Sequence, residues 1–356
     1  MLKKTGHVDF SLTLPEMATL AGRFRSYGWA HLIEPRRYDP PNKTSSSKIL
    51  LFKTSEEQQA CVNTIMDKVL SSIDNLGRAD FAGVEWALNE ITDNVLNHSQ
   101  SQIGGIVQVT LHSRARRAIE FTVCDGGLGV AHTLREAHPE IVSDIAALEE
   151  AVKEGVTRNS TTNQGNGLFG SFEMCRVSGG IFRIHANNAR FELDDGVLSF
   201  RNDVVPFSGT MVDMTIDISN RGILEQALKF KGSYHKPSDI IEHKYEADDL
   251  KSVKLVMSEE VTSFASRISG RPIKIKLKNI VEMCDGQTVV IDFSGVSVIS
   301  SSFADEVFGM LFLELGPMKF MSSIVFVNDS PTIRGLIDRA IMLRMRQGHG
   351  ASDSLT

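Results

Sequence analysis

Apolar residues recur with a helical period in two early segments of the chain. Residues 80–99 are predicted to form an amphipathic helix, whose core-facing stripe consists of Val84, Leu88, Ile91 and Val95. Residues 49–73 are predicted to begin as a strand and continue as a second amphipathic helix. Strand-like runs follow at residues 106–113, 118–125, 180–187, 190–202 and 210–218. Because helices and antiparallel strands segregate, we expect an α+β sandwich rather than a doubly wound sheet.

The last third of the chain has a different pattern. Strands and helices alternate there, and the strand-like runs are continuously apolar, which predicts a small α/β domain with covered sheet faces. The expected elements are a helix at 258–269, a strand or helix at 273–280, a strand at 288–296, a helix at 301–315, a strand at 322–328 and a helix at 331–347. We therefore predict a first domain over residues 1–218, a linker over 219–238 and a second domain over 239–356.

Composition changes this picture little. The 356 residues are 42% hydrophobic and 23% charged, which is typical of a soluble protein with enough apolar side chains for two cores. A net charge of −6 gives no general electrostatic reason to bind nucleic acid or an anionic membrane. No run approaches the roughly 18 apolar residues that span a bilayer. The start, MLKKTGHVDF, lacks an apolar signal core. We expect a cytoplasmic protein.

The helix at 80–99 carries a polar stripe beside its apolar one. Glu90, Asn94 and His98 stand at i, i+4 and i+8, so their side chains share one side of the helix. A carboxamide oxygen suits Mg²⁺, and a carboxylate can orient or deprotonate a water molecule. The alternative interpretation is a solvated helix face, with His98 packed or capping.

Two glycine-rich segments follow. Asp125 ends an apolar strand and precedes a run that contains Gly127 and Gly129, where the backbone can approach a ligand because glycine has no Cβ. A tight turn with an Asp is the alternative. Gly165, Gly167 and Gly170 match GxGxxG, but no strand precedes them, so we expect a phosphate-binding helix start rather than a dinucleotide fold. The sequence contains no P-loop, zinc-protease, nucleophile-elbow or eukaryotic-type kinase motif.

In this order and spacing the segments resemble the GHKL superfamily of ATP-binding domains, which includes gyrase B, histidine kinases and MutL. Glu90 and Asn94 match its helix box ExxxN, and Asp125, Gly127 and Gly129 match its DxGxG box. The second glycine box is matched by Gly165 and Gly167, and the final Gly-Thr by Gly209 and Thr210. The similarity covers about residues 50–218 and implies a GHKL-type sandwich.

The resemblance implies a role for each matched residue. Asn94 would hold Mg²⁺, Asp125 and Thr210 would bind the adenine of ATP, and Gly127 and Gly129 would let the base lie against backbone. Gly165 and Gly167 would wrap the phosphates, and residues 130–164 would form a mobile lid. Glu90 matches the water-activating glutamate of the hydrolysing members. His98 is similar instead to the histidine that often ends the helix box of anti-sigma-factor kinases.

The strand at 288–296 and the helix after it resemble the STAS-like fold of anti-sigma-factor antagonists and of STAS-like domains attached to ATP-binding modules. In the antagonists a serine at this helix start is phosphorylated by a GHKL kinase. Ser301 and Ser302 stand at the corresponding position, but Phe303 and Ala304 replace the usual glycines. Capping of the helix by these serines is the alternative.

Three functions remain open at this point. The first is an ATP-hydrolysing switch of bacterial origin that signals through its STAS-like domain to a protein partner. The second is a serine protein kinase that acts on a STAS domain, and the third is a non-catalytic interaction module. The resemblance also implies a homodimer, formed through residues before Lys48. Basic residues at 271–278 predict a solvated face or, alternatively, a partner or nucleic-acid surface.

Overall fold

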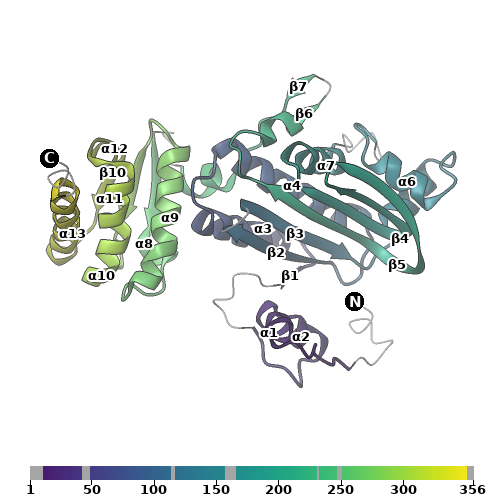
Figure 1. The fold of residues 1–356 in the computed structure, drawn as a ribbon, viewed down its shortest axis with the longest axis horizontal. Coiled ribbons are helices and arrows are strands. Elements are labelled where there is room, and N and C mark those ends of the chain that lie inside the picture. Colours follow the sequence, from purple (N-terminus) through teal and green to yellow (C-terminus); the bar gives the residue numbers. More distant parts are fainter. Residues whose placement is uncertain are drawn as a thin grey trace. The chain divides into compact units, whose positions relative to one another are not determined.

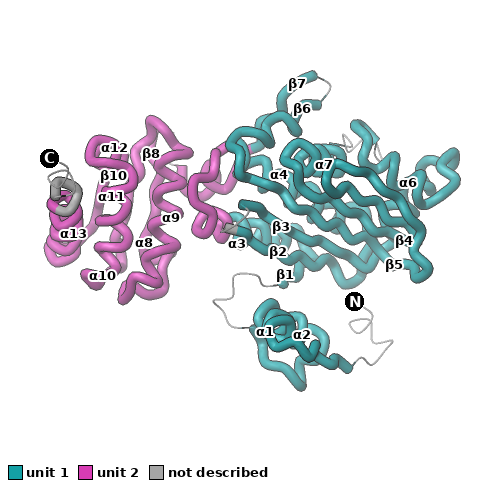
Figure 2. The backbone as a smooth tube through the Cα atoms, in the orientation of Figure 1, with its two compact units in different colours: residues 1–66, 79–237 teal, residues 67–78, 238–356 magenta. Residues whose placement is uncertain are grey.

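Two compact units make up the chain (Figure 2). The computed structural model describes residues 11–41, 49–113, 117–156, 166–230, 232–246 and 251–350. The first unit consists of Met1–Met66 and Ala79–Pro237, and the second of Asp67–Arg78 and Ser238–Thr356. Within the described residues, no helix combines the length and the apolarity that crossing a membrane requires.

A five-stranded antiparallel sheet forms the centre of the first unit (Figure 1). Its order is β1-β2-β3-β5-β4, with bounds Ile49–Phe52 for β1, Gly105–Ser113 for β2, Arg117–Asp125 for β3, Val197–Asp217 for β5 and Ile181–Asp194 for β4. The mixed α+β class is therefore confirmed. The single strand predicted at 190–202 is wrong, because a turn at Asp195 and Gly196 divides it between β4 and β5. Both turn residues have positive φ, as a tight hairpin requires.

The two faces of this sheet differ in chemistry. On β3, Ile119, Phe121 and Val123 are buried on one face, as the period of two in a strand predicts. The opposite face is polar: Thr122 donates to Asp213 Oδ1 at 2.7 Å, and Arg183 forms ion pairs with two carboxylates of β4 and with Asp213 of β5. Because successive side chains point to opposite faces, one face of the sheet is apolar and forms the core, and the other is polar.

The helices that lie wholly or mostly in the first unit are α1 (Ala18–Tyr27), α2 (Trp29–Ile33), α3 (Ser55–Ser72), α4 (Arg78–His98), α5 (Val130–Ala137), α6 (Asp144–Ala151) and α7 (Gly167–Ser178). The long helix α4 buries its predicted apolar stripe. Helix α7 packs closely on it, since a Cβ on Gly170 would come within 2.5 Å of Trp86. Trp29 of α2 donates to Gln108 on β2 at 2.7 Å, so the amino-terminal helices contact the sheet.

The predicted linker over residues 219–238 is instead folded against the first unit. It contains the short helix η2 (Leu224–Leu228) and the two-stranded hairpin of β6 (Lys229–Phe230) and β7 (Ser233–Tyr234). Leu224 and Leu228 are buried, and the buried carboxylate of Asp80 accepts hydrogen bonds from the N–H groups of Gly222 and Leu224. In the sequence, Leu224 and Leu228 stand four residues apart, a helical spacing that indicates a buried face.

A three-stranded parallel sheet forms the centre of the second unit, in the order β10-β9-β8. The strands are β8 (Ser252–Val256), β9 (Thr288–Asp292) and β10 (Ile324–Val327), and the helices are η3 (Ile241–Tyr245), α8 (Met257–Glu260), α9 (Arg267–Met283), α10 (Ser301–Ala304), η4 (Asp305–Gly309), α11 (Met310–Leu315), α12 (Pro317–Ser323) and α13 (Pro331–Gly350). The helix predicted at 258–269 is wrong, because α8 stops at Glu260 and Ser266 caps a new helix. Residues 273–280 are helical.

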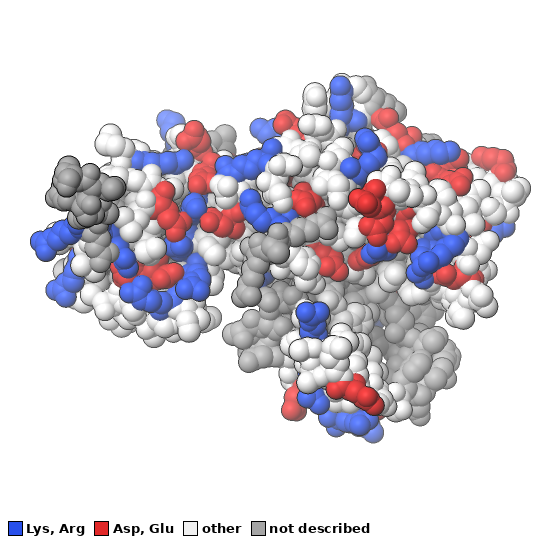
Figure 3. All heavy atoms as spheres, viewed as in Figure 1, with Lys and Arg blue, Asp and Glu red and all other residues white. Residues whose placement is uncertain are grey.

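The basic residues of α9 are neutralised by acidic neighbours within their own unit. Arg267 pairs with Asp305 at 2.6 Å, Lys274 with Glu314 at 2.5 Å, and Lys278 with Asp74 at 3.0 Å. On the face drawn in Figure 3, positive and negative side chains are interspersed. The expected solvated face is thus only partly correct, since Lys276 is 2% exposed. This pairing argues against a nucleic-acid surface on α9.

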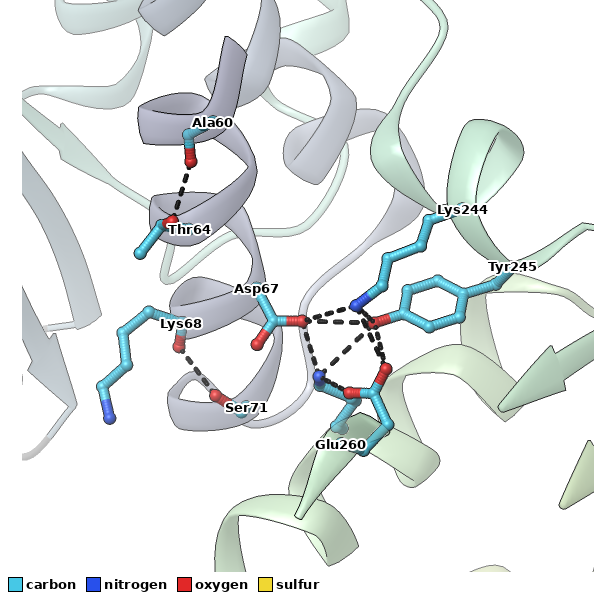
Figure 4. Close-up of polar contacts among 9 residues, drawn as sticks. Ala60, Thr64, Asp67, Lys68, Ser71, Lys244, Tyr245 and Glu260 are labelled. Carbon is cyan, nitrogen blue, oxygen red and sulfur yellow. Dashed lines mark hydrogen bonds and ion pairs between the residues drawn. The ribbon is translucent and has the colours of Figure 1, made fainter. Parts of the chain in front are cut away.

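Lys276 lies in a buried ionic cluster, which we call the Lys276 cluster and define as Lys276, Asp67, Glu260 and Tyr245. Lys276 Nζ donates to Asp67 Oδ1 at 2.6 Å and to Glu260, and the Tyr245 hydroxyl lies 3.1 Å from an oxygen of each of these carboxylates, to one of which it donates its hydrogen. Figure 4 shows Asp67 on α3 facing Tyr245 and Glu260. The carboxyl end of α3 is therefore held as part of the second unit.

Candidate functional site

A cavity of about 410 Å³ opens in the first unit between α4, α7 and the ends of β3 and β5. Six of the predicted site residues line it: Glu90, Asn94, Asp125, Gly129, Gly167 and Thr210. They come from four separate segments of the sequence. Gly127 does not line the cavity, and Gly165 lies outside the described residues, as does the polar end of the predicted lid. A volume of this size is typical of a small-molecule site.

Helix α4 supplies one wall of the cavity. Glu90, Asn94 and His98 all line it, so the polar stripe predicted from the sequence faces the cavity rather than bulk solvent. Val84 and Leu88, from the apolar stripe, are 1% and 0% exposed. The two stripes therefore divide one helix between the core and the site, as the helical period requires.

Asp125 lies at the carboxyl end of β3 and is 3% exposed. Its Oδ1 accepts a hydrogen bond from the Gly127 N–H at 2.7 Å, and its Oδ2 accepts one from the Thr210 N–H at 3.3 Å. Burial raises the pKa of this carboxyl to about 6, although the two N–H donors oppose the shift. At neutral pH the group is a charged acceptor in a cavity, which suits a ligand that donates N–H.

The glycines near Asp125 are explained largely by contacts within the protein. A Cβ on Gly127 would lie 1.8 Å from the Ser99 carbonyl oxygen, and the Leu128 N–H donates to that oxygen at 2.8 Å. Gly127 therefore packs against the end of α4, and its place beneath a base stays a prediction. Gly129 and Gly209 have φ of +85° and +105°, a backbone conformation that favours glycine.

Glu90 stands where the start of α7 meets α4. A Cβ on Gly167 would come within 2.4 Å of Glu90 Oε2, so a larger residue there would displace the Glu90 carboxylate. Burial raises the pKa of Glu90, and the negative charge of Asp93 raises it further. In the described part of the chain Glu90 accepts no hydrogen bond, so its oxygens are available to a ligand or a water molecule.

The described residues contain no group of three or more His, Cys, Asp or Glu side chains that could hold a metal ion. Mg²⁺ does not require such a group, because it is usually bound by one or two protein oxygens together with substrate phosphates. Asn94 lines the cavity, and its side-chain amide carries an oxygen of the kind that Mg²⁺ binds.

Sequence reasoning missed an aromatic group at one end of the cavity. Trp86, Phe230 and His235 all line it, and the Trp86 ring centroid lies 5.7 Å from that of Phe230 and 6.0 Å from that of His235. Phe230 and His235 belong to the segment predicted as a linker. No local motif marks them, because their approach to Trp86 depends on how the β6–β7 hairpin packs.

The serines at the start of α10 lie in the second unit. Ser300 Oγ accepts a hydrogen bond from the Phe303 N–H at 3.1 Å, so Ser300 is the helix cap. Ser302 Oγ lies 3.0 Å from Ser300 Oγ, and Ser301 is exposed. Capping accounts for Ser300, and the exposed hydroxyl of Ser301 is accessible for chemistry.

Comparison with known families identifies the second unit in part. The family described as "STAS-like domain of unknown function (DUF4325)" matches residues 269–334, which run from α9 into the first turn of α13. The chain thus carries a STAS-like domain toward its carboxyl end. No GHKL domain is detected by the same comparison. No curated protein matches the chain.

Proposed function

We propose that the first unit binds ATP with Mg²⁺ in the cavity between α4 and α7 and hydrolyses it slowly, and that the STAS-like domain passes the nucleotide state to a protein partner. One observation carries the proposal. Residues that match four separate motifs of the GHKL superfamily line a single cavity of about 410 Å³. Motif residues gathered by chance would not be expected to share a cavity of ligand size.

The chemistry of one end of the cavity supports adenine binding there. The ionised Asp125 carboxylate accepts a hydrogen bond from the exocyclic amino group of the base. Thr210 Oγ1 already accepts the Val130 N–H at 2.9 Å, so its own hydrogen remains free to be donated to a ring nitrogen or a bridging water. Val123, Leu134 and Val212 provide apolar walls for the ring. These groups distinguish adenine from guanine, which has a carbonyl where adenine has the amino group.

The other end supports phosphoryl transfer to water. The N–H groups of the first turn of α7, beginning at Gly167, favour phosphate oxygens. When bound, Mg²⁺ would neutralise part of the phosphate charge, with Asn94 as its protein ligand. Glu90 accepts a proton from the attacking water as its oxygen bonds to the terminal phosphorus. The bond from that phosphorus to the bridging oxygen breaks, giving ADP and phosphate.

The experiment follows the terminal phosphate of labelled Mg-ATP with the purified full-length protein. We expect free phosphate to form slowly and Glu90→Ala to abolish it, by a factor of at least about 100, while ATP binding persists. Glu136→Ala, an exposed glutamate on α5, is the matched control and should hydrolyse as the parent does. Equal rates for Glu90→Ala and the parent would show that Glu90 is not the base.

The same experiment tests the second function. The exposed hydroxyl of Ser301 at a helix start favours a kinase that acts on the STAS-like domain. Label that stays on the protein, and that is lost when Ser301 and Ser302 become Ala, would make the protein a serine kinase instead. Neither free phosphate nor protein-bound label, with ATP intact, would support an interaction module. A homodimer remains a prediction of the GHKL resemblance.

A further inference from the structure

The β6–β7 hairpin brings a histidine into the cavity from outside the four motifs. His235 directly follows β7, is exposed, and lines the cavity together with Trp86 and Phe230. Its backbone N–H donates to the Leu228 carbonyl at 2.8 Å, which closes the base of the hairpin. The hairpin in turn follows η2, whose entry turn is fixed by the Asp80 carboxylate on α4. The imidazole is thus held beside α4.

Helix α4 shows which end of the cavity His235 occupies. The carbonyl of Ser99, just beyond α4, accepts the Leu128 N–H, so the carboxyl end of α4 lies at the Asp125 loop. Trp86 lies about 20 Å earlier along the helix axis, at 1.5 Å per residue. Glu90 lies between them, about 6 Å from Trp86 along the axis. The His235 ring, 6.0 Å from the Trp86 ring, is therefore at the end of the cavity opposite Asp125, on the Glu90 side.

The charges of the cavity single out this histidine. Among the lining residues that the structure describes, the acidic ones are Glu90, Asp93 and Asp125, and the basic ones are His98 and His235, with no Lys or Arg. His98 is near Asp93. Burial raises the pKa of Asp93, and the histidine opposes this rise only in part. His235 is consequently the basic side chain available at the Glu90 end.

We infer that His235 binds the terminal phosphate of the nucleotide and makes the cavity prefer a nucleoside triphosphate over a diphosphate. The inference rests on the proposed function, because it takes the orientation of ATP from Asp125. An imidazole N–H donates to a phosphate oxygen, and a protonated ring adds a charge-assisted bond. The diphosphate ends before this point, so its binding does not use His235. The hairpin thereby senses the terminal phosphate.

The test compares two probes, ADP and the β,γ-imido analogue of ATP, each with Mg²⁺, by calorimetry on the full-length protein. His235→Ala should weaken the affinity for the ATP analogue by about 10- to 100-fold and leave the affinity for ADP within about twofold. A loss of this size corresponds to one charged hydrogen bond. His235→Lys, which restores a cation, should recover most of the preference. His112→Ala removes a histidine on β2 outside the cavity lining and should change neither affinity.

Tryptophan fluorescence gives a readout that would not depend on the nucleotide if His235 had a purely structural role. The chain has two tryptophans, so Trp29→Phe leaves Trp86 as the single one. Its emission should change with the ATP analogue but not with ADP, and His235→Ala should remove that difference. Equal weakening of both nucleotides by His235→Ala, or no weakening, would overturn the inference while the proposed function stands. If the parent binds neither nucleotide, both are overturned.

Discussion

Asp125 and Glu90 are two carboxyl groups of one cavity with different surroundings. Asp125 accepts two backbone N–H bonds that stabilise its charged form, but burial outweighs them and raises its pKa to about 6. Glu90 has no such donors in the described part of the chain, and both burial and Asp93 raise its pKa. A raised pKa makes either carboxylate a better base, but the Asp125 oxygens are already engaged by N–H donors, so the surroundings favour Glu90 for proton transfer and Asp125 for recognition.

The pKa of Asp125 leads to a pH dependence of base recognition. Only the ionised carboxylate accepts the adenine amino group, so affinity should be constant above the pKa of about 6 and fall as pH drops below it. Between pH 7 and pH 5 we expect a loss of about tenfold, since each unit below the pKa reduces the ionised fraction tenfold. Titration with adenosine, which has no titrating phosphate, measures this directly.

Asp125→Asn supplies the control for that titration. Its amide does not titrate, so the variant should bind adenosine weakly and equally at both pH values. A parent protein whose adenosine affinity is the same at pH 5 and pH 7 would contradict a recognition role for Asp125.

At the scale of elements, α9 is held to the end of α3 by buried polar groups. Lys276 and Asn279 are 2% and 0% exposed. Asn279 Nδ2 donates to the carbonyls of Leu70 and Ile73 at 2.9 and 2.7 Å, while its Oδ1 accepts the Leu76 N–H. Both residues lie on one side of α9, three positions apart, so a single helix face fixes the last turn of α3 and the loop beyond it.

Removing the cation of the Lys276 cluster should destabilise the second unit strongly. Lys276→Met keeps most of the side-chain volume but removes the buried ammonium between Asp67 and Glu260, and leaves the more exposed Lys244 as the only cation beside both carboxylates among the described residues. We expect a loss of about 3 kcal/mol in the free energy of unfolding, measured by denaturant titration. Replacing Glu260 by Leu in the same chain should restore part of that loss, because only one of the two carboxylates then remains.

Arg271→Ala is the matched control on the same helix. Arg271 has a side chain that is 71% exposed and lies 3.6 Å from Glu306, so its loss should cost less than about 1 kcal/mol. If Lys276→Met were as stable as Arg271→Ala, the buried cluster would not be holding α3.

At the scale of the whole molecule, the sequence predicts best where the signal is local. The stripes of α4, the strand β3 with Asp125, and the alternation of the STAS-like region all follow from periods of a few residues. The packing of Phe230 and His235 beside Trp86 depends on tertiary contacts, which no local period records. The same holds for residues 67–78, which lie far from the second unit in sequence and belong to it in the structure.

The division of the chain into two units leads to a prediction about the stability of a fragment of the second unit. Residues 239–356, taken alone, lack the partners of Asn279 and one partner of Lys276, Asp67. They also lack Arg78, which pairs with Asp239 at 2.8 Å and Glu246 at 2.9 Å. Several buried polar groups would then be unsatisfied, at a cost of about 1–3 kcal/mol each. A domain of this size is stable by only about 5–15 kcal/mol. We therefore expect the fragment 239–356 to show no cooperative thermal transition by circular dichroism.

Supplying the missing segment should restore folding. A fragment in which residues 65–78 precede residues 238–356 through a flexible Gly/Ser linker should unfold cooperatively, because the linker lets the segment reach α9. The same fusion with residues 65–78 in scrambled order is the control and should behave as the short fragment does. A cooperative transition of fragment 239–356 at the temperature of the fused one would show that residues 67–78 contribute nothing to the stability of this unit, and that the boundary drawn from the sequence is the physical one.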